Sequence, residues 1–372
     1  MITVIIALAI AQQSSFFART FPNPTGRNGW EEYLMAADIG RAGNMGALLV
    51  GDSKISRLEN DRKMVSSLSK AIEFVRVGNK KAATYPFLGG DDFMDPMVEL
   101  SHIKLLGQVL SADVFANAAD GKPTASSQSI SDALILGRRV GEGQRISGLI
   151  SVAMQGIALR ALSLNLHRLD EKSLADLAEQ FGRIAREPSP LVEGYFGDFK
   201  RWYEIVPHIL RDPESVSFEE EVPEQILNLS ATEIEAATQE ALRSMAEIDK
   251  RAREMFQREE RFWLEPNLEH ENAATAFILS NLPTAMTSPI VRNKTQLRLA
   301  EMHCRVMLHK RQHNDFPASL SDLDGQVKNY DPTTGGPYFY ERISDQSYVL
   351  YSLGTAETGR IDLIYFPDRY RQ

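Results

Sequence analysis

The sequence predicts a mainly α-helical protein: a helical hairpin, bundle or solenoid-like N-terminal region, followed by a small C-terminal α+β domain. Three observations lead to this fold class. Apolar residues recur at helical spacing over most of the chain between residues 30 and 313. Only the part beyond residue 337 carries short tyrosine-rich runs separated by turn residues, a pattern typical of antiparallel strands. The length of 372 residues favours two or three units over one small core.

Residues 1–20 are predicted to be a signal or a clipped membrane anchor. They begin with MITVIIALAIA, which is apolar apart from Thr3 and is followed by the polar QQSS. The run is shorter than the roughly 20 apolar residues of a spanning helix. Its length and the small-x-small triplet Ala9-Ile10-Ala11 favour a secretory signal. Because the usual basic segment before it is missing, an anchor that starts further upstream and an ordinary buried N-terminal segment stay as alternatives.

Residues 30–187 are predicted to form a first helical region, beginning at Trp30. Breaks rich in turn residues separate its helices, for example NAADGKPTASSQS and REPSP. Ser129 or Ser131 is expected to cap one helix, since a serine hydroxyl accepts a free N–H of the first turn. Asp170 is expected to start another helix. The apolar residues that line one side of that helix are Leu174, Leu177, Phe181 and Ile184.

The most apolar internal stretch, residues 148–166, is not expected to span a membrane. Three polar side chains interrupt it, namely Gln155, Arg160 and Asn165. Its apolar residues are instead expected to give one helix of the first region a broad apolar surface.

Residues 188–229 are predicted to be an irregular connection, because this stretch is aromatic, dotted with proline and then acidic. A second helical block is expected over residues 230–288. Ser230 and Glu233 form a capping box there, in which the hydroxyl and the carboxylate each accept a backbone N–H. Apolar residues seven apart then predict a packing seam against another helix. They are Ile234, Ala241, Ile248, Met255 and Phe262, with Met245 and Ala252 between them.

Residues 289–372 are predicted to be the small α+β domain. Its helix, from about Pro289 to His313, ends in basic residues that complement the negative pole of the helix dipole. Asn314 is expected to stop it in the left-handed conformation. The runs PYFYERI, QSYVLYS and IDLIYF then predict a three-stranded antiparallel meander packed on that helix. The apolar face of the helix consists of Leu297, Ala300, Cys304 and Met307.

The motifs of this C-terminal part follow one another in a fixed order. They comprise Phe316, Pro317, Ala318, Ser319, Leu320 and Leu323, then Asp331, Pro332, Gly335, Pro337 and Tyr340, and finally Tyr348, Leu350, Tyr351, Ser352 and Gly354. In this order they resemble the C-terminal region of type II secretion pseudopilins, and more closely a group of uncharacterised bacterial envelope proteins, mainly over residues 297–366. The long helical region is also similar to that envelope group, which carries an N-terminal membrane helix. The resemblance implies an envelope address and a C-terminal fold, but not assembly into a pseudopilus.

The resemblance also raises the question of calcium, because pseudopilins of this type often bind calcium in the loop after the Tyr-Ser-x-Gly strand. Calcium takes six or more oxygen ligands, several of them carboxylates. In the corresponding loop, GTAETGRID, the only acids are Glu357 and Asp362, with Arg360 between them. These two acids are the candidate calcium ligands, and a plain turn between strands is the alternative. Apart from metal ions at this site and at the histidine pair described next, no cofactor is predicted.

A second candidate metal site is the pair His309 and His313, one helical turn apart and suited to sharing a zinc ion. His303, Cys304 and Glu301 lie nearby in the sequence. The alternative is that these imidazoles are surface groups at the negative end of a helix.

The functional prediction is a non-catalytic scaffold or binding protein of the cell envelope, periplasmic or membrane-anchored, with a link to secretion as a further expectation. Protein partners and membrane association through the N-terminus are expected. The net charge of −9 argues against a nucleic-acid partner. One alternative is a hydrolase whose site is assembled from dispersed groups, such as the trio Asp91, Asp92 and Asp95 or the pair His309 and His313. The other alternative is a cytoplasmic helical adaptor.

Overall fold

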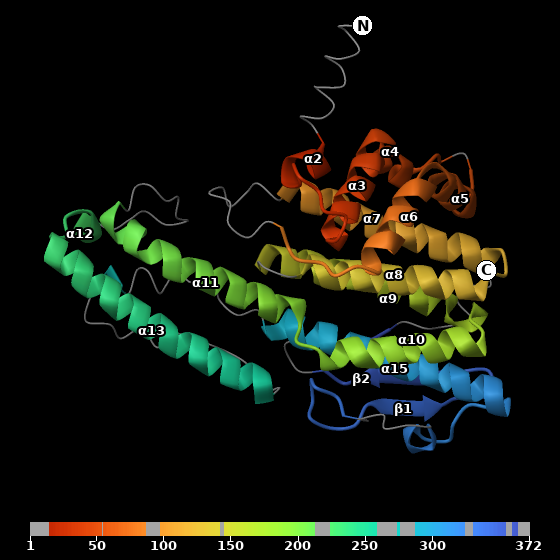
Figure 1. Ribbon diagram of the computed structural model, residues 1–372. Helices are drawn as coiled ribbons and strands as arrows, with labels where there is room; N and C mark the ends of the chain where they lie inside the picture. Colours follow the sequence, from red (N-terminus) through yellow and green to blue (C-terminus); the bar gives the residue numbers. More distant parts are fainter. Residues whose placement is uncertain are drawn as a thin grey trace, which may run out of the picture.

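The computed structural model describes residues 15–53, 55–86, 97–141, 145–212, 224–258, 274–275, 287–323, 330–354 and 359–363. It confirms the predicted fold class, because stacked helices form most of the molecule and a three-stranded antiparallel sheet lies near the C-terminal end (Figure 1). The apolar segment 1–11 lies outside the described residues. The folded body is described from Ser15 onward.

Five helices form the N-terminal layer: α2 (Phe16–Thr20), α3 (Gly29–Ala42), α4 (Met45–Val50), α5 (Arg57–Ser67) and α6 (Ser69–Asn79). Helix α3 begins where predicted, capped by Asn28, whose side-chain oxygen accepts the N–H of Trp30 at 3.1 Å. Trp30 itself is fully buried. Helices α3 and α6 pack closely because of Gly78, where an added Cβ would lie 2.5 Å from Cε1 of Tyr33.

Four long helices form the middle of the body: α7 (Met97–Ala119), α8 (Pro123–Val140), α9 (Arg145–Asn165) and α10 (Glu171–Arg186), with the short 3-10 helix η1 (Leu166–Arg168) between the last two. The predicted cap of α10 is confirmed, because Asp170 accepts the N–H of Ser173 at 2.8 Å. The predicted serine caps are wrong. Helix α8 begins at Pro123, whose fixed φ suits the first helical position. Ser129 and Ser131 therefore lie inside the helix.

Helix α9 together with η1, Ile146–Arg168, is long and apolar enough to cross a membrane by length and composition, and it is the one such helix among the described residues. Half of its most apolar stretch is buried inside the protein, where α9 packs against α7, α8 and α11. Its apolar side chains serve the core in this fold.

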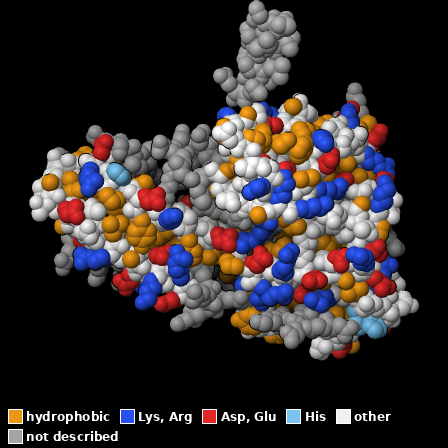
Figure 2. Space-filling model, viewed as in Figure 1, with side chains coloured by type: hydrophobic (Ala, Val, Ile, Leu, Met, Phe, Trp, Pro, Cys, Tyr) orange, Lys and Arg blue, Asp and Glu red, His pale blue; other side chains and the backbone are white. Residues whose placement is uncertain are grey.

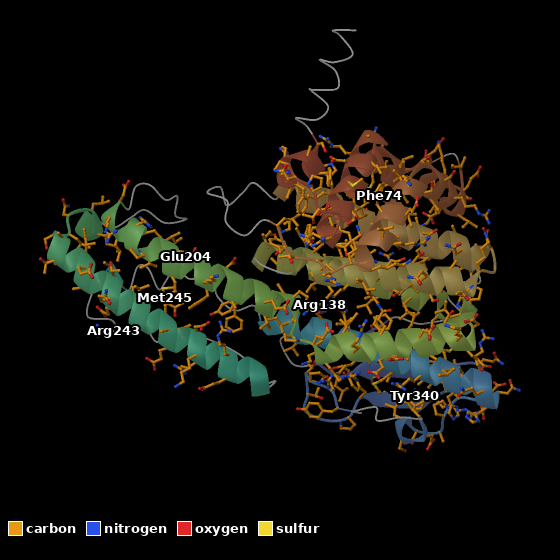
Figure 3. All side chains as sticks on the ribbon, viewed as in Figure 1. Phe74, Arg138, Glu204, Arg243, Met245 and Tyr340 are labelled. Atoms are coloured by element: carbon orange, nitrogen blue, oxygen red, sulfur yellow. The ribbon has the colours of Figure 1, made fainter. Side chains whose placement is uncertain are left out.

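The predicted irregular connection at 188–229 is wrong over most of its length, because α11 (Pro190–Arg211) is a continuous helix. Ser189 caps it and Pro190 occupies its first position, so residues that suggested a break instead start the helix. Arg138 on α8 holds this start through bonds to Glu187 at 3.1 Å and Glu193 at 2.8 Å (Figure 3).

Beyond the main body, α11 pairs with α13 (Ala231–Arg258), and the short helix α12 (Glu224–Leu227) precedes α13 (Figure 1). The capping box is confirmed: Ser230 N–H donates to Glu233 at 2.8 Å, and Glu233 N–H donates to the Ser230 hydroxyl at 3.3 Å. The predicted seam is confirmed at Ala241 and Met245, which are fully buried in a separate small core with α11. Met245 is labelled in Figure 3. The side chains of Ala252, Met255 and Phe262 lie outside the described residues.

Helix α15 (Thr287–His313) packs along α10 and also contacts α9. Its predicted apolar face is confirmed, since Leu297, Ala300, Cys304 and Met307 are all buried. Asn314 ends the helix at φ +57°, the left-handed stop that the sequence predicted. One continuous core runs from α2 to α10 and on to α15 and the sheet. The predicted domain boundary at residue 289 therefore does not separate two cores.

The sheet consists of β1 (Phe339–Arg342), β2 (Tyr348–Ser352) and β3 (Ile361–Asp362), paired antiparallel in that order. Tyr348, Leu350 and Ser352 alternate along β2 and are buried. Contacts of β2 and β3 with α15 place this buried face on the helix, as predicted.

Candidate binding groove

A large hollow of about 1120 Å³ opens where several helices end. Its walls come from the start of α5, the end of α7, the end of α9 with η1, and the last turn of α15. A second hollow of about 700 Å³ adjoins it along α4, α5, α7 and α9. The two hollows share Arg57, Asp61 and Phe115. We call them together the basic groove.

Cationic side chains dominate the charge of the basic groove. Those that line it are Arg57, Arg160, Arg168, Lys310 and Arg311. Asp52 and Asp61 are the acids in its lining. This balance differs from the chain as a whole, which carries −9. It also differs from the face shown in Figure 2, where basic and acidic side chains are interspersed.

The cations are held in place by local structure. Ser56 caps α5 and so places Arg57 in its exposed first turn, where the guanidinium lies 5.6 Å from the ring centre of Phe115. Arg311 reaches across from α15 and donates to the carbonyl oxygen of His167 at 2.8 Å. Lys310 lies 5.3 Å from the ring centre of Phe316. Cation–π contacts of this kind fix a charged group over an apolar surface.

Two of these cations also complete helix ends. Lys310 donates to the carbonyl oxygen of Asn314 at 2.9 Å. Arg311 donates to the carbonyl oxygen of His167, which follows α9. Both contacts satisfy carbonyls at the negative ends of helices. Within the described part of the chain, Arg57, Arg160 and Arg168 form no ion pair with a carboxylate. All three are exposed, and Arg168 donates to Nε2 of His167 at 3.3 Å.

Asp61 lies at the junction of the two hollows. Partial burial raises the pKa of its carboxyl group, and the neighbouring Arg57 guanidinium lowers it, with burial the larger effect. The net rise means that the carboxylate is poorly solvated at this point.

Apolar side chains line the groove between the charges: Leu58, Phe115, Leu164, Met307 and Phe316. Such a surface suits a ligand that combines anionic groups with apolar ones. The sequence did not predict this groove. Its cations lie between residues 57 and 311 and meet only because helices distant in the sequence converge. A partial signal was the tendency of basic residues to lie at helix C-termini, which applies to Lys310 and Arg311.

The predicted histidine pair lies outside the lining of the groove. His309 and His313 are neighbours as predicted, with ring centres 4.3 Å apart, and histidine side chains are visible at the surface where α15 ends (Figure 2). Nδ1 of His309 lies 3.0 Å from the carbonyl oxygen of Asp315. Glu301 instead pairs with Arg305 at 2.9 Å. In the described ranges no group of three or more His, Cys, Asp or Glu side chains is placed to hold a metal ion.

His303 and Cys304 are core residues of α15. Nδ1 of His303 lies 2.8 Å from the hydroxyl oxygen of Tyr348 on β2, in a fully buried position. Burial lowers the pKa of His303 from 6.5 to about 3 and raises the pKa of the Cys304 thiol. Neither residue is placed to act on a ligand in the groove.

We expect the buried His303 to make the fold acid-sensitive. Because its folded pKa is about 3 and its unfolded pKa about 6.5, the unfolded chain binds the extra proton between these values. The free energy of unfolding should therefore fall as the pH drops from 6.5, by up to about 1.4 kcal/mol per pH unit. Urea denaturation of the natural chain and of His303→Gln from pH 7 to pH 4 measures this, and equal slopes would contradict it.

The two predicted calcium ligands are not both described. Glu357 lies outside the described residues, as do Asp91, Asp92 and Asp95. Asp362 lies on β3 and pairs with Arg360 at 3.1 Å. The described part of the loop thus offers one carboxylate, which already has a cationic partner.

The C-terminal motif residues that were singled out in the sequence hold the sheet and its loops together. Asp331 is fully buried, and its carboxylate accepts the Ser352 hydroxyl at 2.6 Å and the Thr333 N–H at 2.8 Å. The Tyr340 hydroxyl donates to the carbonyl oxygen of Pro317 at 2.7 Å (Figure 3). These contacts indicate that the motif residues are needed for folding of the sheet and not for binding of a ligand.

Comparison of the chain with protein-family models, with curated proteins and with solved structures finds no match.

Proposed function

We propose that this protein is a non-catalytic binding protein of the cell envelope, held at a membrane by its N-terminal segment, and that the basic groove receives an anionic partner. The observation that carries the proposal is the groove itself. Five Lys and Arg side chains line two joined hollows in a chain of net charge −9. Such concentration of one charge sign in a concave surface attracts ligands of the opposite sign.

The start of the folded body supports the envelope address. The apolar run ends at Ala11, and the body is anchored from Ser15. Asp38 on α3 accepts the Ser15 hydroxyl at 2.6 Å, the Phe16 N–H at 2.9 Å and the Phe17 N–H at 3.0 Å. Phe16 is buried in the core. An extended residue spans about 3.5 Å, so a membrane that held the apolar run would lie close to α2 and α3.

The resemblance of residues 297–366 to pseudopilin-like envelope proteins supports the same address. It adds no activity, because the motif residues that carry it, such as Asp331 and Ser352, bond to one another in the sheet.

Location and binding are tested together in cells that express the full chain. After fractionation, the protein should sediment with membranes, and protease added to spheroplasts should degrade it while a cytosolic marker stays intact. Photo-crosslinking from a position in the groove, Leu58, should capture a protein partner, whereas crosslinking from Arg183 on α10 should not. Recovery in the cytosolic fraction would favour the helical-adaptor alternative and overturn the address.

The hydrolase alternative is tested on the purified full chain with ester and peptide substrates. We expect no turnover above that of the double variant His309→Ala with His313→Ala. Turnover that this double variant abolishes would overturn the non-catalytic assignment.

A further inference from the structure

We infer that the basic groove binds an acidic polypeptide segment of a partner protein, one in which carboxylates are interleaved with apolar side chains, and that Asp61 sets where those carboxylates are tolerated. This inference rests on the proposed function, because it takes the groove as the binding site and names the class of its ligand.

The distribution of charge favours a ligand with several separate anionic groups. The cations come from four elements: Arg57 from α5, Arg160 from α9, Arg168 from η1, and Lys310 with Arg311 from α15. Arg160 lines the smaller hollow, the η1 and α15 cations line the larger one, and Arg57 lines both. A lone phosphate would instead call for donors converging on one point. Carboxylates spaced along an extended chain match charges spread over two joined hollows.

The apolar lining favours a polypeptide over a nucleic acid. Single-stranded nucleic acids bind by stacking bases on open aromatic faces. In the groove, however, the Arg57 guanidinium lies over Phe115 and Lys310 lies over Phe316, and Phe316 is only 5% exposed. Leu58, Leu164 and Met307 offer aliphatic contacts instead. Such contacts suit leucine- or valine-like side chains of a peptide.

Asp61 adds a selective element at the junction of the hollows. Its carboxylate opposes a ligand carboxylate placed there, while Arg57 on its own helix and Arg160 on α9, which line the same hollow, attract one. A repulsive group inside an attractive surface is a common source of specificity. Neutralising Asp61 should therefore strengthen the binding of a uniformly acidic peptide, an effect that a merely structural side chain would not produce.

The experiment measures binding of a fluorescein-labelled twelve-residue peptide, alternating Glu and Leu, to the full chain by fluorescence anisotropy at low and high salt. Replacing Arg57 and Arg168 together by Gln should weaken binding about tenfold, and Asp61→Asn should tighten it about threefold. The matched control is Arg183→Gln, an exposed arginine on α10 outside the groove, which should change nothing. Arg57, Arg168 and Arg183 are exposed and Asp61 is half-buried, and unchanged melting temperatures verify that each variant is folded.

Four results would overturn the inference. They are equal binding of a Gln–Leu peptide, equal losses in the Arg183→Gln control, weaker binding by Asp61→Asn, and preferential competition by inorganic phosphate, an oligonucleotide or anionic vesicles. Failure of the inference is distinguishable from failure of the proposed function. If cells yield an envelope protein with a partner crosslinked at Leu58 but the acidic peptide does not bind, only the ligand class is wrong. If the peptide binds but the protein is cytosolic, only the address is wrong.

Discussion

Replacing Arg76 by Met should lower the free energy of unfolding by about 3–5 kcal/mol, because it removes the cation that holds two buried carboxylates. Arg76 on α6 donates to Asp113 on α7 at 2.9 Å and to Asp132 on α8 at 3.1 Å. Their side chains are only 9% and 2% exposed. Without the guanidinium, two buried carboxylates on α7 and α8 lose the cation that they share.

Neutral side chains also donate hydrogen bonds to the same two carboxylates. Ser129 donates to Asp113 at 2.5 Å, Asn117 donates to it at 2.9 Å, and Asn79 donates to Asp132 at 3.0 Å. These neutral donors satisfy lone pairs of the carboxylates but cannot supply the missing positive charge.

Urea denaturation at pH 7 measures the loss. Lys70→Met is the matched control, because Lys70 lies on the same helix and pairs with Glu73 at 2.8 Å, with both side chains more than 60% exposed. An exposed pair of this kind contributes at most about 1 kcal/mol. Similar losses for the two variants would show that the Arg76 network is not a centre of stability.

Replacing Asp331 by Ala should lower the free energy of unfolding by about 3 kcal/mol, from loss of hydrogen bonds to a buried carboxylate. Besides Ser352 and Thr333, Asp331 accepts the Thr334 hydroxyl at 2.9 Å. It thereby ties the turn before β1 to the end of β2. The turn is also joined to α15, since the hydroxyls of Thr333 and Thr295 lie 2.6 Å apart. The substitution should therefore loosen the sheet from the helix.

Hydrogen exchange resolved along the chain distinguishes this local effect from general destabilisation. Amides of β1 and β2 should exchange faster in Asp331→Ala, while those of α7 and α8 should change little below the global unfolding limit. Asp345→Ala, an exposed substitution in the β1–β2 connection, serves as the control. Unchanged protection of the strands in Asp331→Ala would contradict the role assigned to the motif.

Local patterns in the sequence predicted much of the fold. The caps at Asp170 and at Ser230 with Glu233, the left-handed stop at Asn314 and the three strands all depend on residues close in the chain. Apolar spacing predicted the buried faces of α10 and α15 for the same reason, because a helix presents every third or fourth residue to its neighbour. The errors arose where local signals were ambiguous: Pro190 started a helix instead of breaking one.

The sequence by itself determined that this protein is mainly helical, that a tyrosine-rich sheet lies near its C-terminal end, and that an apolar segment precedes the folded body. Only the tertiary structure decided that α15 belongs to the same core as α2 to α10. It also decided that cations more than 250 positions apart, such as Arg57 and Arg311, line one groove. The physical reason is that capping and periodicity act within a few residues. Which helix ends meet depends on how whole helices cross, and this cannot be inferred from any single stretch of the chain.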